Sequence, residues 1–169
     1  MFDFNNFWHA HTPILSILIP AFTSFLLLLL GNPGSGSLKQ DWRQPWRRGI
    51  SLGSALLGLI TAISYLMIAN TGQVTVYQLG EWSAPFGIVL VLDRLSAFML
   101  VLTYALAVPV IWYASDNWDT RGRYFHTMFH FLLMGITGAF LTGDLFNLFV
   151  FFEILLMASY VLLLHGQGR

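Results

Sequence analysis

The fold of this chain is decided by one apolar stretch with an acid in its middle, GDLFNLFVFFEILLMASYVLLL, at positions 143–164. At about 1.5 Å per residue, a helix from Asp144 to Leu164 is roughly 30 Å long, which matches the hydrocarbon core of a bilayer. Glu153 lies near its centre. A carboxylate at that depth costs on the order of 2.5–3.5 kcal/mol on insertion scales, and such residues usually mark ion or proton routes. We therefore predict that Glu153 transfers a proton or forms an ion pair; the alternative is a neutral glutamic acid that only holds two helices together.

The composition supports a membrane protein. Hydrophobic residues make up 56% of the chain and charged residues 9%, against roughly 25% charged residues in a soluble domain. The formal net charge is zero, so no basic excess indicates nucleic-acid binding. Cysteine is absent, which excludes disulfides and thiolate metal sites made by this chain. We expect membrane lipid as a partner, no nucleic acid, and no bound cofactor or metal.

Long apolar runs predict an all-α membrane protein with five transmembrane helices. The expected spans are 13–30, 49–69, 95–114, 124–141 and 144–164. Only Thr142 and Gly143 separate the last two spans, which therefore form an antiparallel hairpin. Before the third span, segments 74–79 and 88–92 predict a small extramembrane β-hairpin, because the second segment is short and rich in β-branched residues. Asp93-Arg94 then separates that hairpin from the third helix.

Basic residues predict the orientation of the chain. Seven of the eight fall in stretches that alternate onto one side of the membrane: Lys39, Arg43, Arg47, Arg48, Arg121, Arg123 and Arg169. By the positive-inside rule, the N-terminus is outside and the C-terminus inside.

Four further side chains are candidates for a role beside Glu153. His126 and His130 are four apart and share a helical face, but further zinc ligands are missing from the pattern. His130 lies about two turns into the fourth span and near the expected depth of Glu153, so it is either a proton relay or a hydrogen-bonded interface histidine. Asp144 is predicted to be the N-cap of the fifth helix. Asn147, one turn further, is predicted to hydrogen-bond between helices.

The motif TGDLFNLFVFFE at positions 142–153, followed by ASYVL at 158–162, resembles the fifth transmembrane helix of the D subunit of Mrp-type multisubunit Na⁺/H⁺ antiporters. Phe86-Gly87-Ile88 and LDRLSA at 92–97 also resemble that protein, at the entry to its third helix. The family belongs to a superfamily with the antiporter-like subunits of respiratory complex I and of membrane-bound hydrogenases. The resemblance implies the N-terminal part of a fourteen-helix subunit, with helices one to three and their loops at positions 1–123. Positions 124–169 then hold helices four and five, the start of the first five-helix repeat.

The resemblance also implies a mechanism and partners. Glu153 pairs with a lysine on a broken seventh helix, and movement of that pair gates proton transfer. The implied function is Na⁺ (or K⁺)/H⁺ exchange by a secondary transporter, not an enzyme, with other Mrp subunits in a bacterial inner membrane. Because this chain ends after helix five, it is expected to be a truncated product or one part of a split subunit. Two alternatives remain: a proton-pumping subunit of an NADH:quinone oxidoreductase-like or hydrogenase-like complex, and a remnant that does not transport.

Overall fold

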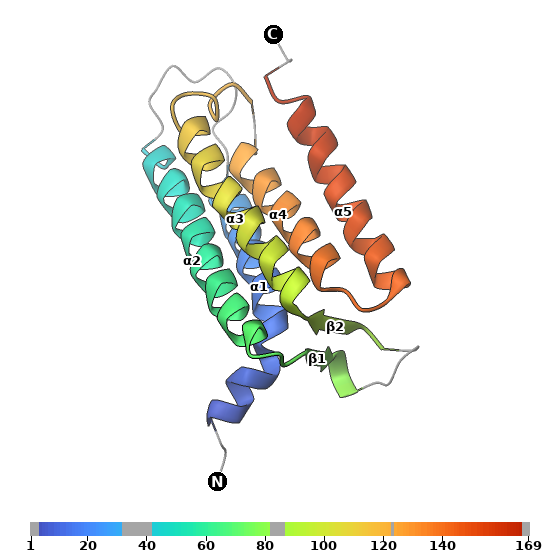
Figure 1. Ribbon diagram of the computed structural model, residues 1–169. Coiled ribbons are helices and arrows are strands. Elements are labelled where there is room, and N and C mark those ends of the chain that lie inside the picture. The colour runs from blue at the N-terminus through green and yellow to red at the C-terminus, as the bar shows by residue number, and fades with distance from the viewer. Residues whose placement is uncertain (1–3, 32–41, 82–86, 123, 167–169) are drawn as a thin grey trace.

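The structure, a computed structural model, describes residues 4–31, 42–81, 87–122 and 124–166. Within these ranges five α-helices run side by side as a bundle of alternating direction (Figure 1). They are α1 (Phe4–Leu29), α2 (Gln44–Asn70), α3 (Arg94–Ala114), α4 (Phe125–Leu141) and α5 (Leu145–Leu163). The five predicted helices are thus confirmed. The apolar part of α1, residues 13–29, matches the predicted first span, but the helix itself begins earlier, at Phe4, and holds Pro13 and Pro20 inside it. Each proline removes one backbone hydrogen bond and crowds the carbonyl four residues before it, which bends a helix more often than it ends one when the surrounding helices hold it.

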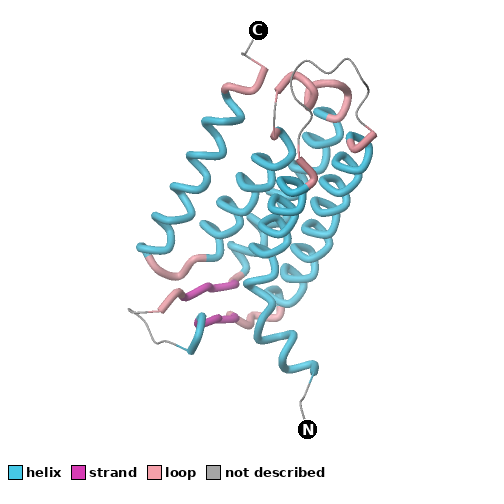
Figure 2. Tube along the Cα trace, turned by 180° about the vertical axis from the view of Figure 1, so that it is seen from behind, coloured by secondary structure: helices cyan, strands magenta, loops and turns pink. Residues whose placement is uncertain are grey.

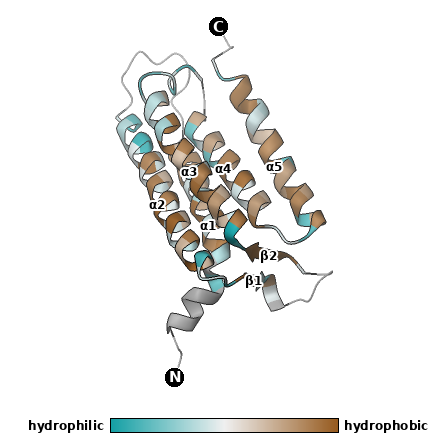
Figure 3. Ribbon diagram, viewed as in Figure 1, coloured by the Kyte–Doolittle hydropathy of each residue, from teal (hydrophilic) through white to brown (hydrophobic). Residues whose placement is uncertain are grey.

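The helices have the length and apolarity of membrane spans. α2, α3 and α5 are each long and apolar enough to cross a bilayer, while the apolar parts of α1 and α4, residues 13–29 and 125–141, are shorter. Figure 3 shows apolar residues along most of each helix, with hydrophilic ones gathered toward the ends of the bundle. The outer faces keep large apolar side chains exposed, as expected where lipid or further helices cover them.

The predicted β-hairpin is present at one end of the bundle (Figure 2). β1 (Thr75–Gln78) pairs antiparallel with β2 (Val89–Leu92). β2 also meets the turn between α4 and α5, where the Gly143 N–H donates to the Val89 carbonyl oxygen at 2.7 Å. The hairpin therefore fixes the start of α5 as well as the start of α3.

The charged pair at the start of α3, Asp93 and Arg94, contacts a neighbouring helix as well as α3 itself. Asp93 and Ser96 form a capping box, with the Ser96 N–H 2.7 Å from Asp93 Oδ1 and the Asp93 N–H 2.9 Å from Ser96 Oγ. Arg94 donates to the Ala69 and Asn70 carbonyl oxygens at 3.1 and 3.0 Å. These carbonyls lie in the last turn of α2, where a cation is favoured. The one basic residue at the hairpin end of the described bundle thus has a structural role.

The remaining described basic residues lie at the opposite end, which we call the basic end. Arg43, Arg47 and Arg48 are at the start of α2, and Arg121 lies in the connection from α3 to α4. α5 finishes at the same end (Figure 1). Lys39, Arg123 and Arg169 lie outside the described residues, and the side of the membrane that the basic end faces remains a prediction.

α5 packs chiefly on α4, through two glycines that allow a close approach. A Cβ atom on Gly135 would lie 2.9 Å from the Leu155 backbone nitrogen, and one on Gly138 would overlap the Phe151 ring. Small residues at such a crossing let two membrane helices come together over a long contact. These two glycines therefore set the position and rotation of α5.

We predict that Gly135→Ala pushes α5 away from α4, because the added methyl meets backbone that cannot rotate aside. Overpacking of this kind costs about 1–3 kcal/mol. Unfolding in detergent micelles, followed by circular dichroism, should show the loss. Gly53→Ala on α2 is the matched control, since a Cβ there meets nothing within 4 Å; equal stability of both variants would contradict close packing at Gly135.

Candidate functional site

Glu153 lies in the middle of α5 on a face that the rest of the described chain leaves uncovered. Its neighbours on that face, one turn before and one turn after, are Phe149 and Met157, with 62% and 65% of their surfaces exposed. The buried side of α5 is made by Asn147, Phe151 and Ala158. No hydrogen bond or ion pair to Glu153 is present within the described residues. The carboxylate is therefore available to a group that approaches α5 from outside this bundle.

The start of α5 is built as the sequence predicts. Asp144 is the N-cap, and its Oδ1 accepts the Asn147 N–H at 2.6 Å. Its Oδ2 accepts the Val89 N–H of β2 at 3.3 Å. Asn147 is buried, and its side-chain amide donates to Thr142 Oγ1 at 3.1 Å, which ties α5 to the end of α4. Both residues hold the helix that carries Glu153, so their contacts here are structural.

His130 and His126 belong to a second polar region, which sequence reasoning did not assemble. A chain of hydrogen bonds, which we call the polar array, runs inward from the basic end: Arg48, Asp119, His126, Ser51 and His130. Arg48 donates two bonds to the Asp119 carboxylate, at 2.8 and 2.7 Å. Asp119 Oδ2 is 3.1 Å from His126 Nε2. Ser51 Oγ then lies 3.0 Å from His126 Nδ1 and 3.0 Å from His130 Nε2.

Asp119 is the charged centre of the array. It is buried in the connection between α3 and α4, which places it at the basic end. Burial alone would raise the pKa of this carboxyl, but hydrogen bonds from His126 and Arg48 outweigh it and hold the pKa well below its usual range. Gln44 adds a weaker bond at 3.3 Å. Asp119 is therefore an anion at neutral pH and acts only as an acceptor.

The structure does not bring His130 and Glu153 together. Gly135 faces Leu155 and Gly138 faces Phe151, so Glu153 is level with a point near residue 137 of α4. His130 therefore lies about seven residues, or roughly 10 Å, nearer the basic end than Glu153. The expectation of similar depth does not hold, and His130 turns toward Ser51 on α2 while Glu153 lies on the uncovered face of α5.

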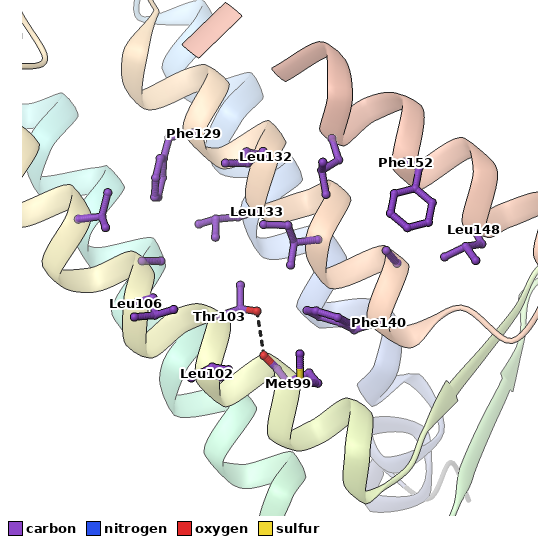
Figure 4. Close-up of a pocket in the computed structure, with 15 residues that line it drawn as sticks. Met99, Leu102, Thr103, Leu106, Phe129, Leu132, Leu133, Phe140, Leu148 and Phe152 are labelled. Atoms are coloured by element: carbon purple, nitrogen blue, oxygen red, sulfur yellow. Dashed lines mark hydrogen bonds between the residues drawn. The ribbon is translucent and has the colours of Figure 1, made fainter. Parts of the chain in front are cut away.

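An apolar groove of about 470 Å³ lies between α3 and α5, with α4 as its floor (Figure 4). Leu102 and Leu106 of α3 and Phe152 of α5 line its sides, and Leu133 of α4 lines its floor. The hydroxyl of Thr103, the polar side chain in its lining, already donates to the Met99 carbonyl oxygen at 2.8 Å. The groove therefore offers no ligand set for a cation. Within the described residues, no group of three or more His, Cys, Asp or Glu side chains could hold a metal ion.

Two residues of the polar array, Ser51 and Asp119, were not singled out from the sequence. Ser51 is 75 positions from His126 and 79 from His130, and a serine in an apolar helix has no distinctive pattern. The available signal was the shared face of His126 and His130, which predicts one common partner for both. The identity of that partner depends on how α2 packs on α4.

The chain has relatives of known family over nearly its whole length. It is 47% identical over 166 residues to a probable K⁺/H⁺ antiporter D subunit of Rhizobium meliloti, a match that covers 95% of this chain and 29% of the relative. It is 40% identical over 159 residues to the Na⁺/H⁺ antiporter D subunit of Alkalihalophilus pseudofirmus, a match that covers 92% of this chain and 30% of the relative. The chain thus spans less than a third of the length of these relatives. No family model matches the chain.

Solved structures agree with the fold. One chain in the Mrp complex from Dietzia sp. matches with a TM-score of 0.82 and 27% identity, over 95% of this chain and 28% of that one. A chain of the membrane-bound sulfane sulfur reductase, an archaeal respiratory membrane complex, matches with a TM-score of 0.73 and 24% identity. The match covers 88% of this chain and 29% of that one, and at this identity it shows a shared fold alone. Together with the apolar helices, these likenesses identify a multi-pass membrane protein.

We predict that Asp119→Asn destabilises the basic end by roughly 1.5–3 kcal/mol at pH 7, because the bonds from Arg48 and His126 lose their charged acceptor. The folded-state pKa of Asp119 is lowered, so its stabilisation is complete above about pH 4, the ordinary range of an aspartate, and is lost as the pH falls further. Below that pH, wild type and variant should converge. Denaturant unfolding in micelles at several pH values measures this.

The control is Asp116→Asn, which neutralises an exposed acid in the same connection. It should change stability by less than about 0.5 kcal/mol. A pH-independent difference between wild type and Asp119→Asn would contradict the role given to the ion pair.

Proposed function

We propose that this chain, which by its sequence similarity belongs with the D subunits of Mrp-type cation/proton antiporters, forms the part of such a protein that carries the proton-transferring carboxylate Glu153. The whole assembly would exchange a monovalent cation for protons and would be a secondary transporter, not an enzyme. The observation that carries the proposal is an uncovered carboxylate at the middle of a helix able to cross a bilayer.

Energetics support a protein partner for Glu153. A carboxylate that faces lipid at mid-membrane depth is costly, whereas one opposite a cation on another helix is stabilised as an ion pair. The basic residues within the described part of the chain lie at the helix ends: Arg43, Arg47, Arg48, Arg94 and Arg121. The cation that pairs with Glu153 therefore comes from another segment or another protein of the assembly. The family resemblance gives that place to a lysine on a broken helix.

A bistable ion pair can gate proton transfer. Burial favours the neutral acid, while a nearby cation favours the carboxylate. When the cation moves away, Glu153 takes up a proton, and when it returns, the proton is released. The carboxylate thus couples a movement of charge to proton uptake, as cation/proton exchange requires.

The relatives' names support the exchange of a monovalent cation without choosing between Na⁺ and K⁺, since both appear among them. We propose other antiporter subunits as partners and a bacterial inner membrane as the location, because the named relatives are bacterial antiporter subunits. The fold is also present in a respiratory membrane complex. Sequence identity to antiporter subunits is the reason to favour exchange over redox-driven pumping.

We predict that Glu153→Gln lowers cation-dependent proton exchange at least tenfold, because the amide cannot ionise, while assembly stays near normal. The assay uses inside-out vesicles that hold the assembled complex, a pH-sensitive dye, and addition of NaCl or KCl. Glu153→Asp, which keeps a carboxyl group on a shorter side chain, should retain a measurable part of the activity.

The comparison requires equal amounts of assembled complex, measured by blue native electrophoresis. If a fully assembled Glu153→Gln complex exchanged ions at the wild-type rate, the role of Glu153 would be lost. If Glu153→Asp and Glu153→Gln failed equally, side-chain length would matter more than proton affinity.

A further inference from the structure

The polar array ends in an open hydrogen-bonding position inside the bundle. His130 is fully buried, with an exposed fraction of 0%. Its Nε2 is bonded to Ser51, but its Nδ1 has no hydrogen-bond partner within the described residues. Leaving a buried imidazole nitrogen unpaired costs about 1–3 kcal/mol. Such a cost is commonly retained where the group has a role beyond packing.

With both imidazole rings taken as neutral, hydrogen-bond accounting gives a single arrangement of the protons in the array. The Asp119 carboxylate only accepts, so His126 must present Nε2–H to it. The neutral His126 ring then offers Nδ1 as an acceptor, and it takes the one hydroxyl proton of Ser51. Ser51 Oγ in turn accepts from His130 Nε2–H, which leaves His130 Nδ1 as a free lone pair. Every donor in the array thus points toward Asp119.

We propose that His130, Ser51 and His126 form a proton relay between the interior of the bundle and Asp119 at the basic end. This relay deepens the proposed function and rests on it, since it supplies a path for part of the proton movement. It joins a proton-accepting nitrogen in the bundle interior to an anion at the basic end.

The transfer step is balanced within the three side chains. A proton binds the lone pair of His130 Nδ1, and the proton on His130 Nε2 moves to Ser51 Oγ. The original hydroxyl proton of Ser51 moves at the same time to His126 Nδ1. His126 becomes an imidazolium paired with the Asp119 carboxylate, and His130 ends neutral with its proton on Nδ1. No group is oxidised or reduced, and one positive charge has moved from His130 to His126.

Both end states keep the array bonded. After transfer, His126 Nδ1–H donates to Ser51 and Ser51 donates to His130 Nε2, so the two bonds at Ser51 reverse their direction while the bonds to Asp119 keep theirs. The only site in the array that changes from acceptor to unpaired donor is His130 Nδ1. A serine hydroxyl suits the central place because it donates one hydrogen bond and accepts others at one atom.

Nearby rings and charges support the relay. The Phe125 ring lies edge-on to His126 at 5.3 Å, and the Phe129 ring lies edge-on to His130 at 6.4 Å. These aromatic groups keep the imidazoles in a site of low polarity, where hydrogen bonds are strengthened. The ionised groups that face His126 are Asp119 and, behind it, Arg48. Arg48 offsets part of the charge of Asp119.

The first test reads the protons directly. ¹⁵N-histidine NMR of the full chain in lipid nanodiscs should show His126 and His130 both as Nε2–H tautomers near pH 7. Ser51→Ala should alter the ring nitrogen signals of both histidines, because it removes the atom that joins them. Ser54→Ala is the matched control on the same helix, since Ser54 bonds Thr23 instead, and it should leave both spectra unchanged. A resting Nδ1–H tautomer at His126, or histidine signals unaffected by Ser51→Ala, would overturn the relay.

The second test uses transport by the assembled complex. Ser51→Ala should slow proton exchange at least fivefold, and Ser54→Ala should stay within twofold of wild type, at equal complex content and unchanged circular dichroism. If Glu153→Gln abolished exchange while Ser51→Ala kept the wild-type rate, the relay would be wrong and the proposed function would stand. If Glu153→Gln had no effect, the proposed function would fail, and the NMR result would still decide whether the array has the protonation that the relay needs.

Discussion

A polar group inside a membrane bundle has no water to bond with, so it must find its partner within protein or remain at a cost. This constraint explains the arrangement of the polar side chains. Asp119 has Arg48 and His126, and Asp144 has the backbone of the α5 start and of β2. Each of these acids is fully occupied by groups of this chain. Glu153, in the middle of α5, receives no hydrogen bond or ion pair from the described residues, and our proposal gives it a functional role for that reason.

The approach of α5 to α4 decides where Glu153 lies. Because Gly135 and Gly138 leave room for Leu155 and Phe151, α5 buries one narrow side against α4. The rotation that buries Phe151 turns Glu153 outward. A larger residue at either glycine would move the carboxylate by moving the whole helix. The contact of β2 with the start of α5 sets the position of that helix along the bundle axis. Packing and capping together therefore decide where the middle of α5, and with it Glu153, lies.

The sequence was sufficient for features that depend on local chemistry. Uniform apolarity predicted the helices, β-branched residues before Asp93 predicted the hairpin, and the position of Asp144 after Gly143 predicted its cap. The sequence was insufficient for contacts that depend on which helices pack against each other and which faces they present. Nothing local relates Ser51 to His130, and helical rise alone placed His130 near the depth of Glu153, because the offset between α4 and α5 depends on the glycine contacts. The early start of α1 was missed because Pro13 suits the first turn of a helix better than its interior, so local chemistry favoured a start there.

The two polar sites differ in a way that indicates separate tasks. The polar array is enclosed by α2, α4 and the connection before α4, and its ion pair is complete, so it can pass a proton without any large movement. Glu153 lies on an uncovered face of α5, and in the proposed mechanism its charge state follows a cation that approaches and withdraws. A cation/proton exchanger needs both properties. A proton path whose proton affinity never changes cannot couple proton movement to cation movement, and a carboxylate that changes its proton affinity needs a path that connects it to water. If both proposals hold, a moving group or ordered water would have to bridge the roughly 10 Å along the bundle axis between the levels of His130 and Glu153.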